Sequence, residues 1–180
     1  MEVQVTEIEV MVEGEGLADV EIVRIPQGAA AREIVAAVAL KGGFPVEEAV
    51  LLVEDSDAPV DLALVITEDI AGGKIHHVHR TKKIAVKVFY KHLEKEQHFP
   101  PSARVQRVLD WAVSKEGFNI DPTLAPIMEL ALHDEKIPED QKKPLPKNAH
   151  IGRYVHHPHH CLELDLIRGV VPNGADGAAR

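Results

Sequence analysis

Histidine and cysteine are the residues of this sequence with the most obvious capacity for metal chemistry. Residues 156–161 read His-His-Pro-His-His-Cys, and three more histidines lie within residues 76–79. Imidazole and thiolate bind zinc and copper, so the candidate ligands are His156, His157, His159, His160 and Cys161. However, neighbouring side chains of a strand point to opposite faces, the proline forces a turn, and the spacing matches no zinc finger. We therefore expect a solvated loop without a metal site, and no cofactor; a metal-responsive protein is kept as an alternative.

Cys161 is the single thiol of the chain and so the one possible cysteine nucleophile. A neighbouring imidazole can activate such a thiol, but the cysteine stands at the start of an expected strand, with no glycine elbow behind it and no carboxylate to orient a base. We expect no catalytic residue and no enzyme activity. One cysteine excludes an intrachain disulfide, and no signal peptide is evident, so we expect a cytoplasmic protein.

The end of the sequence carries a different chemistry, because an alternating strand runs there into a glycine. Residues 162–168 read Leu-Glu-Leu-Asp-Leu-Ile-Arg, and Gly169 follows. An extended segment of this kind can add to a partner's sheet, with its side chains in pockets. Glycine lets another backbone or a thiolate approach closely, because it has no Cβ. Gly169 is therefore the candidate reactive end, and the candidates for tail recognition are Leu164, Leu166, Ile167 and Arg168.

The elements that must position this end occur in the same order in both halves of the chain. In the first half, alternating apolar residues predict a strand over 7–13 and a second strand ending at Ile25, and helical spacing predicts a helix over 29–40. Further apolar stretches follow at 50–53, 62–66 and 74–79.

The second half repeats this order with clearer patterns. Alternation predicts strands over 83–91 and 92–99, and Ser102 is expected to be the N-cap of a helix whose apolar stripe has helical spacing. The stripe consists of Val105, Val108, Leu109, Ala112 and Val113. Two more strands are expected, over 127–132 and 162–166, separated by a polar segment that prolines interrupt.

Strand, strand, helix, strand, loop and strand make up the β-grasp plan, in which a sheet wraps one helix. The chain is therefore predicted to be α+β, with two tandem ubiquitin-like domains at 1–80 and 81–169. A disordered extension is expected over 170–180. A single larger α+β domain is the alternative, but the order repeats and the charge changes at the same point.

The charge of the chain is concentrated in the first half. Through Arg80 there are five Lys and Arg against sixteen Asp and Glu, a net of −11, whereas the remainder carries a net of +2. An acidic half repels phosphates, so nucleic acid is not expected as a partner; the acidic surface also serves solubility. No apolar run approaches the length of about 20 residues that spans a bilayer, so no membrane contact is expected.

The C-terminal end resembles the end of ubiquitin. Residues 147–154, Lys-Asn-Ala-His-Ile-Gly-Arg-Tyr, resemble the turn near a tyrosine that precedes ubiquitin's last strand, and residues 161–169 resemble that strand and its Leu-Arg-Gly ending. With two domains, the chain is similar to the tandem ubiquitin-like modifiers of bacterial anti-phage (Bil-type) operons and to the interferon-induced tandem modifier of vertebrates. It departs from ubiquitin in having one glycine, followed by Val170, where ubiquitin has two.

This resemblance implies a protein modifier that acts in anti-phage defence. A zinc-dependent deubiquitinase-like peptidase would remove residues 170–180 after Gly169, and activating and conjugating enzymes would join the new carboxylate to lysines of target proteins, a phage structural protein among them. Gly174 and Gly177 are alternative ends. The alternative function is a non-covalent ubiquitin-like scaffold or interaction module without tail chemistry.

Overall fold

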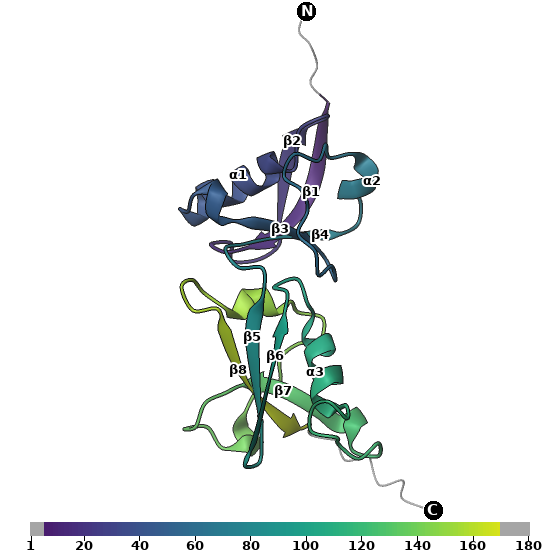
Figure 1. The fold of residues 1–180 in the computed structure, drawn as a ribbon, viewed down its shortest axis with the longest axis vertical. Coiled ribbons are helices and arrows are strands. Elements are labelled where there is room, and N and C mark those ends of the chain that lie inside the picture. Colours follow the sequence, from purple (N-terminus) through teal and green to yellow (C-terminus); the bar gives the residue numbers. More distant parts are fainter. Residues whose placement is uncertain (1–5, 170–180) are drawn as a thin grey trace, which may run out of the picture.

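The computed structural model describes residues 6–169 and places them in two sheets of four strands each, stacked along the long axis of the molecule (Figure 1). The extension expected at 170–180 lies outside the described residues. Each sheet has its own apolar core and its own helix, and the two are joined by the short segment 80–83. No described helix has the length and apolar character needed to cross a membrane.

The first domain is built from a hairpin, a helix and two further strands. Its elements are β1 (Glu7–Gly14), β2 (Glu21–Pro26), α1 (Arg32–Gly42), η1 (Val46–Glu48), β3 (Val50–Val53), α2 (Glu68–Ala71) and β4 (Ile75–His79). The strand order is β2-β1-β4-β3, in which β4 runs parallel to β1 and antiparallel to β3. The last strand of the domain therefore lies in the interior of the sheet.

The second domain repeats this topology. Its elements are β5 (Ile84–Tyr90), β6 (Leu93–Phe99), α3 (Val105–Val113), η2 (Ala125–Ile127), β7 (Met128–Leu132), η3 (Glu139–Gln141), η4 (Ile151–Tyr154) and β8 (Cys161–Arg168). The strand order is β6-β5-β8-β7, with β8 parallel to β5 and antiparallel to β7. The expectation of an α+β protein with two tandem β-grasp domains is confirmed.

Alternation of apolar and polar residues produces both cores. In β5, Ile84, Val86 and Val88 are buried on the side that faces α3, while the residues between them lie on the other side of the strand. The apolar stripe of α3 completes this core, because Val105, Val108 and Ala112 are fully or almost fully buried. The strand and helix patterns of the sequence therefore predicted the core of this domain correctly.

Both helices begin with the same backbone arrangement, which the sequence did not reveal. The first N–H groups of α1 donate to the carbonyl oxygens of Leu64 and Leu62, and those of α3 donate to the carbonyls of Ala149 and Lys147. These bonds satisfy donors that a helix cannot satisfy within itself. The apolar stretch at 62–66 is thus a capping segment for α1, and so is its equivalent in the second domain for α3.

The expected role of Ser102 as an N-cap is wrong. The N-cap position of α3 is Arg104, and the helix has no side-chain cap because backbone carbonyls already accept its first N–H groups. The Ser102 hydroxyl instead donates to the carbonyl of Ser56 in the first domain, at 3.0 Å. A residue that looks like a local cap therefore makes a contact between the domains.

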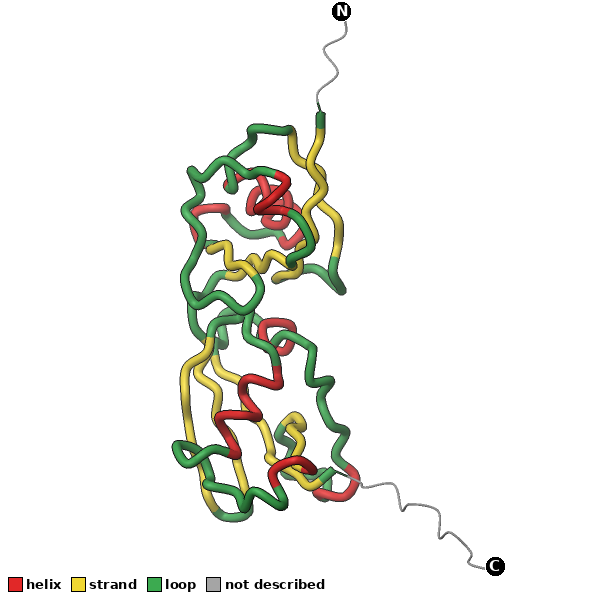
Figure 2. Tube along the Cα trace, turned by 90° about the vertical axis from the view of Figure 1, so that its right-hand side faces the viewer, coloured by secondary structure: helices red, strands yellow, loops and turns green. Residues whose placement is uncertain are grey.

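The second domain covers the face of the first sheet that lies opposite α1 (Figure 2). Glu13, His77 and His79 lie on this face and are buried despite being polar. Gly152 of η4 lies close to this face, because a Cβ at this position would lie 2.6 Å from the His79 ring of the first domain, and also 2.9 Å from the carbonyl oxygen of Pro101 in its own domain. The two domains therefore approach closely at this point, and a larger residue than glycine would not fit without a shift.

We predict that Gly152→Ala lowers the free energy of unfolding by about 1–3 kcal/mol, the usual cost of overpacking. Urea denaturation of both this variant and the double variant with His79→Ala measures the effect. The loss caused by Gly152→Ala should be smaller when the His79 ring is absent. An equal loss in both backgrounds would show that the two residues do not pack as described.

Candidate functional site

β8, the strand that leads to Gly169, occupies the middle of the second sheet. It pairs with β5 from Ala85 opposite Cys161 to Phe89 opposite Asp165, and with β7 from Leu132 opposite Leu164 onward. Residues 164 and 165 are thus paired on both edges, where the two pairings overlap. This doubly paired part cannot add to a partner's sheet while the domain is folded, because only an unpaired edge offers free N–H and C=O groups.

The apolar residues of β8 are part of the core. Leu164, Leu166 and Ile167 are 0%, 2% and 3% exposed, whereas Arg168 is exposed. The expectation that these three apolar side chains form a recognition surface is therefore corrected, because their contacts are inside the domain. Arg168 is the one predicted recognition residue that remains available to a partner.

Asp165 fixes the outer face of the same strand. It forms an ion pair with Lys142, and its Oδ1 lies 2.9 Å from Nδ1 of His133. The His133 ring in turn stacks on Phe89, with 4.3 Å between the ring centroids. The polar segment before β8, which the sequence suggested only as an irregular connection, thus packs over the strand that carries the candidate reactive end.

The last three residues of β8 differ from the rest of the strand. Pairing with β5 stops at Asp165, while pairing with β7 continues to Arg168 opposite Met128. Residues 166–168 therefore have no strand neighbour on the β5 side within the described part of the chain. A partner strand could reach the backbone here without displacing a native strand.

Gly169 is held directly against the end of the sheet. Its N–H donates to the carbonyl oxygen of Ile127 at 2.7 Å, and a Cβ would lie 2.9 Å from this same oxygen and 2.9 Å from Oε2 of Glu129. Glycine is needed here for close approach to the domain's own backbone. The sequence suggested the space for a partner, but not this internal contact.

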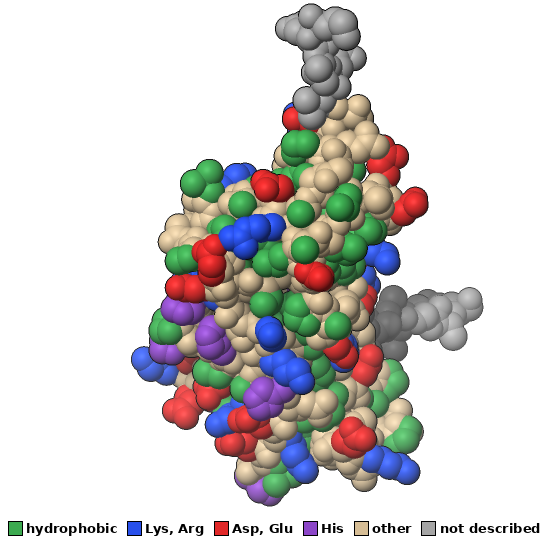
Figure 3. All heavy atoms as spheres, turned by 45° about the horizontal axis from the view of Figure 1, so that its top comes forward, with side chains coloured by type: hydrophobic (Ala, Val, Ile, Leu, Met, Phe, Trp, Pro, Cys, Tyr) green, Lys and Arg blue, Asp and Glu red, His purple; other side chains and the backbone are tan. Residues whose placement is uncertain are grey.

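The histidine loop does not form a metal site in the described structure. His156, His157 and His159 are exposed, as is Cys161, and Figure 3 shows histidine side chains at the surface. Within residues 6–169, three or more ligand-type side chains come within binding distance of one another only at Glu13, His77 and His150. The sequence patterns did not reveal this group, because its members are far apart in the sequence. The available signal was that Glu13 and His77 are polar residues within strands that otherwise contribute to a core.

Burial sets the charge of this interdomain group. It lowers the pKa of His77 to about 3, and the charges of His150 and His79 act in the same direction. Burial would raise the pKa of Glu13, but the hydrogen bond with His150 and the charge of Arg153 outweigh it and hold this pKa below its ordinary value. At neutral pH the group therefore contains a neutral imidazole beside an ionised carboxylate.

Comparison with known proteins places the second domain. Residues 85–169 match the family model described as BilA ubiquitin-like domain 2. The second domain is thus similar to the Bil-type ubiquitin-like domains. The match to the Bil-type family covers the whole second sheet and ends at Gly169, the residue that follows β8. This confirms the resemblance that the C-terminal residues suggested.

Other comparisons are more distant. None of the curated proteins compared with the chain matches it. Among solved structures, the C-terminal ubiquitin-like domain of mouse tubulin-specific chaperone e is similar at 12% identity and a TM-score of 0.34, over 43% of this chain and 89% of that one. The RA domain of a guanine nucleotide exchange factor for Rap1 is similar at 18% identity and a TM-score of 0.34, over 54% of this chain and 88% of that one.

At the end of the second domain, Leu164 is buried in the core and Arg168 is exposed to solvent, and this difference can be tested. Leu164→Ala should lower the free energy of unfolding by about 2–5 kcal/mol, because it leaves a cavity in the core. Arg168→Ala, further along the same strand, is the matched control. It should change the free energy of unfolding by less than about 0.5 kcal/mol. Urea denaturation measures both. Equal effects of the two substitutions would contradict the described burial.

Proposed function

We propose that this protein is a ubiquitin-like modifier that is attached to target proteins through Gly169. The observation that carries the proposal is the end of the second domain: the Bil-type family match ends at this glycine, which directly follows the last strand. The backbone just before the glycine is accessible on one side, because residues 166–168 are paired with β7 only.

The chemistry begins with removal of residues 170–180. A zinc-dependent peptidase hydrolyses the amide between Gly169 and Val170 and leaves a carboxylate on the glycine. An activating enzyme adenylates this carboxylate with ATP and releases pyrophosphate, and a cysteine thiolate then displaces AMP to form a thioester. The amine of a target lysine displaces the thiolate, on the activating or a conjugating enzyme, and an isopeptide bond results.

In this proposal the enzymes would recognise the exposed part of the C-terminal end. The buried leucines of β8 keep the strand in place, so the accessible part of the end consists of Arg168, the backbone of residues 166–168 and Gly169 itself. The bond from the Gly169 N–H to Ile127 must break for the glycine to enter an active site. This is one net hydrogen bond, about 0.5–1.5 kcal/mol, which enzyme contacts can replace.

Attachment of the chain would act through its bulk. The 180-residue chain has a mass of 19.8 kDa, and all of it except residues 170–180 is added to each modified subunit, which can block an assembly interface sterically. In anti-phage defence the target would be a phage structural protein, whose assembly depends on such interfaces. In this proposal the chain is a substrate of enzymes and has no catalytic residue of its own.

The test is to produce the chain together with the activating enzyme, conjugating enzyme and peptidase of a Bil-type operon. The intact mass should correspond to a chain that ends at Gly169, and conjugates should appear on immunoblots. Gly169→Glu, or deletion of Gly169, should abolish conjugation, because the added side chain or the lost residue removes the unhindered carboxylate. Arg168→Ala should weaken it at unchanged stability.

Gly174→Glu is the matched control, since it makes the same chemical change beyond the proposed cleavage point. It should leave conjugation unaffected. Conjugates that persist without Gly169 but disappear in the Gly174→Glu variant would show that the reactive end is Gly174 and not Gly169. A chain that keeps Arg180 in the presence of all three enzymes would favour the non-covalent scaffold.

A further inference from the structure

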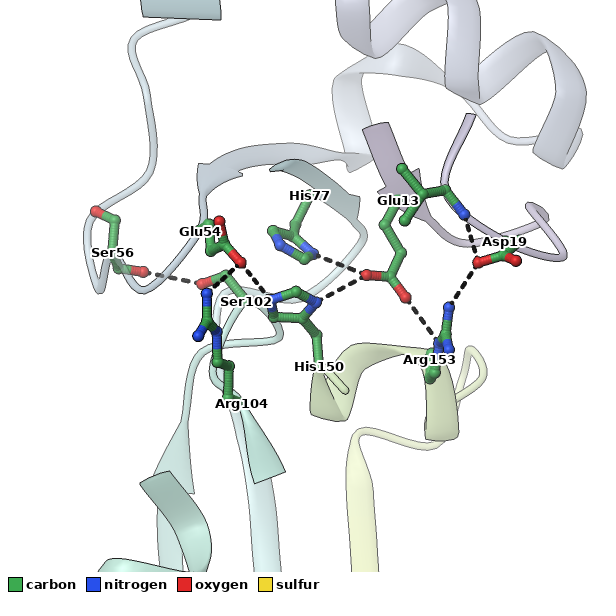
Figure 4. Close-up of polar contacts among 10 residues, drawn as sticks. Glu13, Asp19, Glu54, Ser56, His77, Ser102, Arg104, His150 and Arg153 are labelled. Carbon is green, nitrogen blue, oxygen red and sulfur yellow. Dashed lines mark hydrogen bonds and ion pairs between the residues drawn. The ribbon is translucent and has the colours of Figure 1, made fainter. Parts of the chain in front are cut away.

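Three buried polar side chains from both domains meet at the centre of the interdomain contact (Figure 4). Glu13 comes from β1, His77 from β4, and His150 from the residue just before η4. Their side chains are 6%, 0% and 6% exposed, and their ligand atoms all lie within 4.8 Å of one another. Such a group of imidazoles and a carboxylate is the kind of set that binds zinc in proteins.

The spacing of the atoms suits a single ion. Oε2 of Glu13 lies 2.9 Å from Nδ1 of His150 and 3.9 Å from Nδ1 of His77. Ligands of a tetrahedral zinc, each about 2.0–2.2 Å from the metal, are about 3.4 Å apart. The two observed separations bracket this value, so small rotations of the side chains would place all three atoms around one ion.

His77 gives an independent indication of a missing ligand. Its side chain is completely buried, yet neither ring nitrogen has a hydrogen-bond partner among the described residues. Buried polar groups without partners are rare in native proteins, because they lose the hydrogen bonds that water would supply. A cation bound at Nδ1 would provide the missing interaction.

Neighbouring side chains already orient two of the three ligands. Oε1 of Glu13 accepts a hydrogen bond from Nε of Arg153 at 2.8 Å, which leaves Oε2 facing the two rings. Nε2 of His150 lies 3.2 Å from Oε1 of Glu54, so Nδ1 is the nitrogen that points to the group. Carboxylate partners of this kind are typical of metal-binding histidines, where they fix the ring and its tautomer.

We propose that Glu13, His77 and His150 bind one zinc ion that joins the two domains. Two ligands belong to the first domain and one to the second, and a water molecule would complete the tetrahedron. The ion would replace the present contact between His150 and Glu13, while the contact of His150 with Glu54 is kept. Zinc binding would then restrict the motion of the domains relative to each other. This site is independent of conjugation through Gly169.

The test uses the full-length chain without an affinity tag, stripped of metal and then dialysed against zinc chloride. Elemental analysis should find one zinc ion per chain, and cobalt(II) in its place should give the strong visible absorption of a tetrahedral site. Zinc should also raise the melting temperature of the wild-type chain. Loss of a ligand should weaken binding by more than the roughly 10–100-fold that loss of an outer partner costs.

Two variants and one control decide the result. His77→Leu fills the buried position with an apolar side chain and should lose the zinc; Glu13→Gln keeps the side-chain shape and decides the matter if His77→Leu does not fold. In the control, alanine replaces the exposed loop residues His156, His157, His159 and His160, and the zinc should remain bound. Zinc that is lost in the loop variant, or that stays bound in Glu13→Gln with wild-type affinity, would overturn the proposal.

Discussion

Arginines of the second domain reach carboxylates of the first, and these contacts hold the two β-grasp units against each other. Arg153 donates to both Glu13 and Asp19, and Arg107 donates to both oxygens of Asp57. Exposed pairs contribute only about 0.2–1 kcal/mol each, whereas a buried carboxylate must be paired. Glu13 is the buried member, so its position depends on the docked second domain. Part of the acidic surplus in the first half of the sequence therefore serves this contact.

Local patterns predicted the strands and helices well, because alternation and helical spacing reflect which side of an element is buried. They failed where a backbone partner is distant. The N-termini of α1 and α3 are capped by carbonyl oxygens of residues 62–66 and 147–149. Every residue type has such an oxygen, so the side chains of these segments do not indicate the role. The prediction for Ser102 was wrong because its hydroxyl donates to a distant partner, the carbonyl of Ser56, which is 46 residues away, and not to its own helix.

The candidate end was predictable only in part. An alternation of leucines with acidic residues looks the same in a free tail and in a central strand, so the burial of Leu164 and Leu166 emerged only with the sheet order. Gly169 was found because glycine has a specific chemical use at such an end. The group of Glu13, His77 and His150 could not be found, since Glu13 and His150 are 137 residues apart and meet only through the packing of two domains.

β8 ends at the opposite end of its domain from η4, the element that contacts the first domain (Figure 1). In a chain attached to a surface through Gly169, as proposed above, the second domain would consequently lie next to the surface and the first domain would lie farther from it. The acidic first domains of neighbouring chains would repel one another, with a range of about 8–10 Å at physiological salt. A decorated assembly would thus acquire a spaced, negatively charged outer layer that keeps other acidic surfaces at a distance.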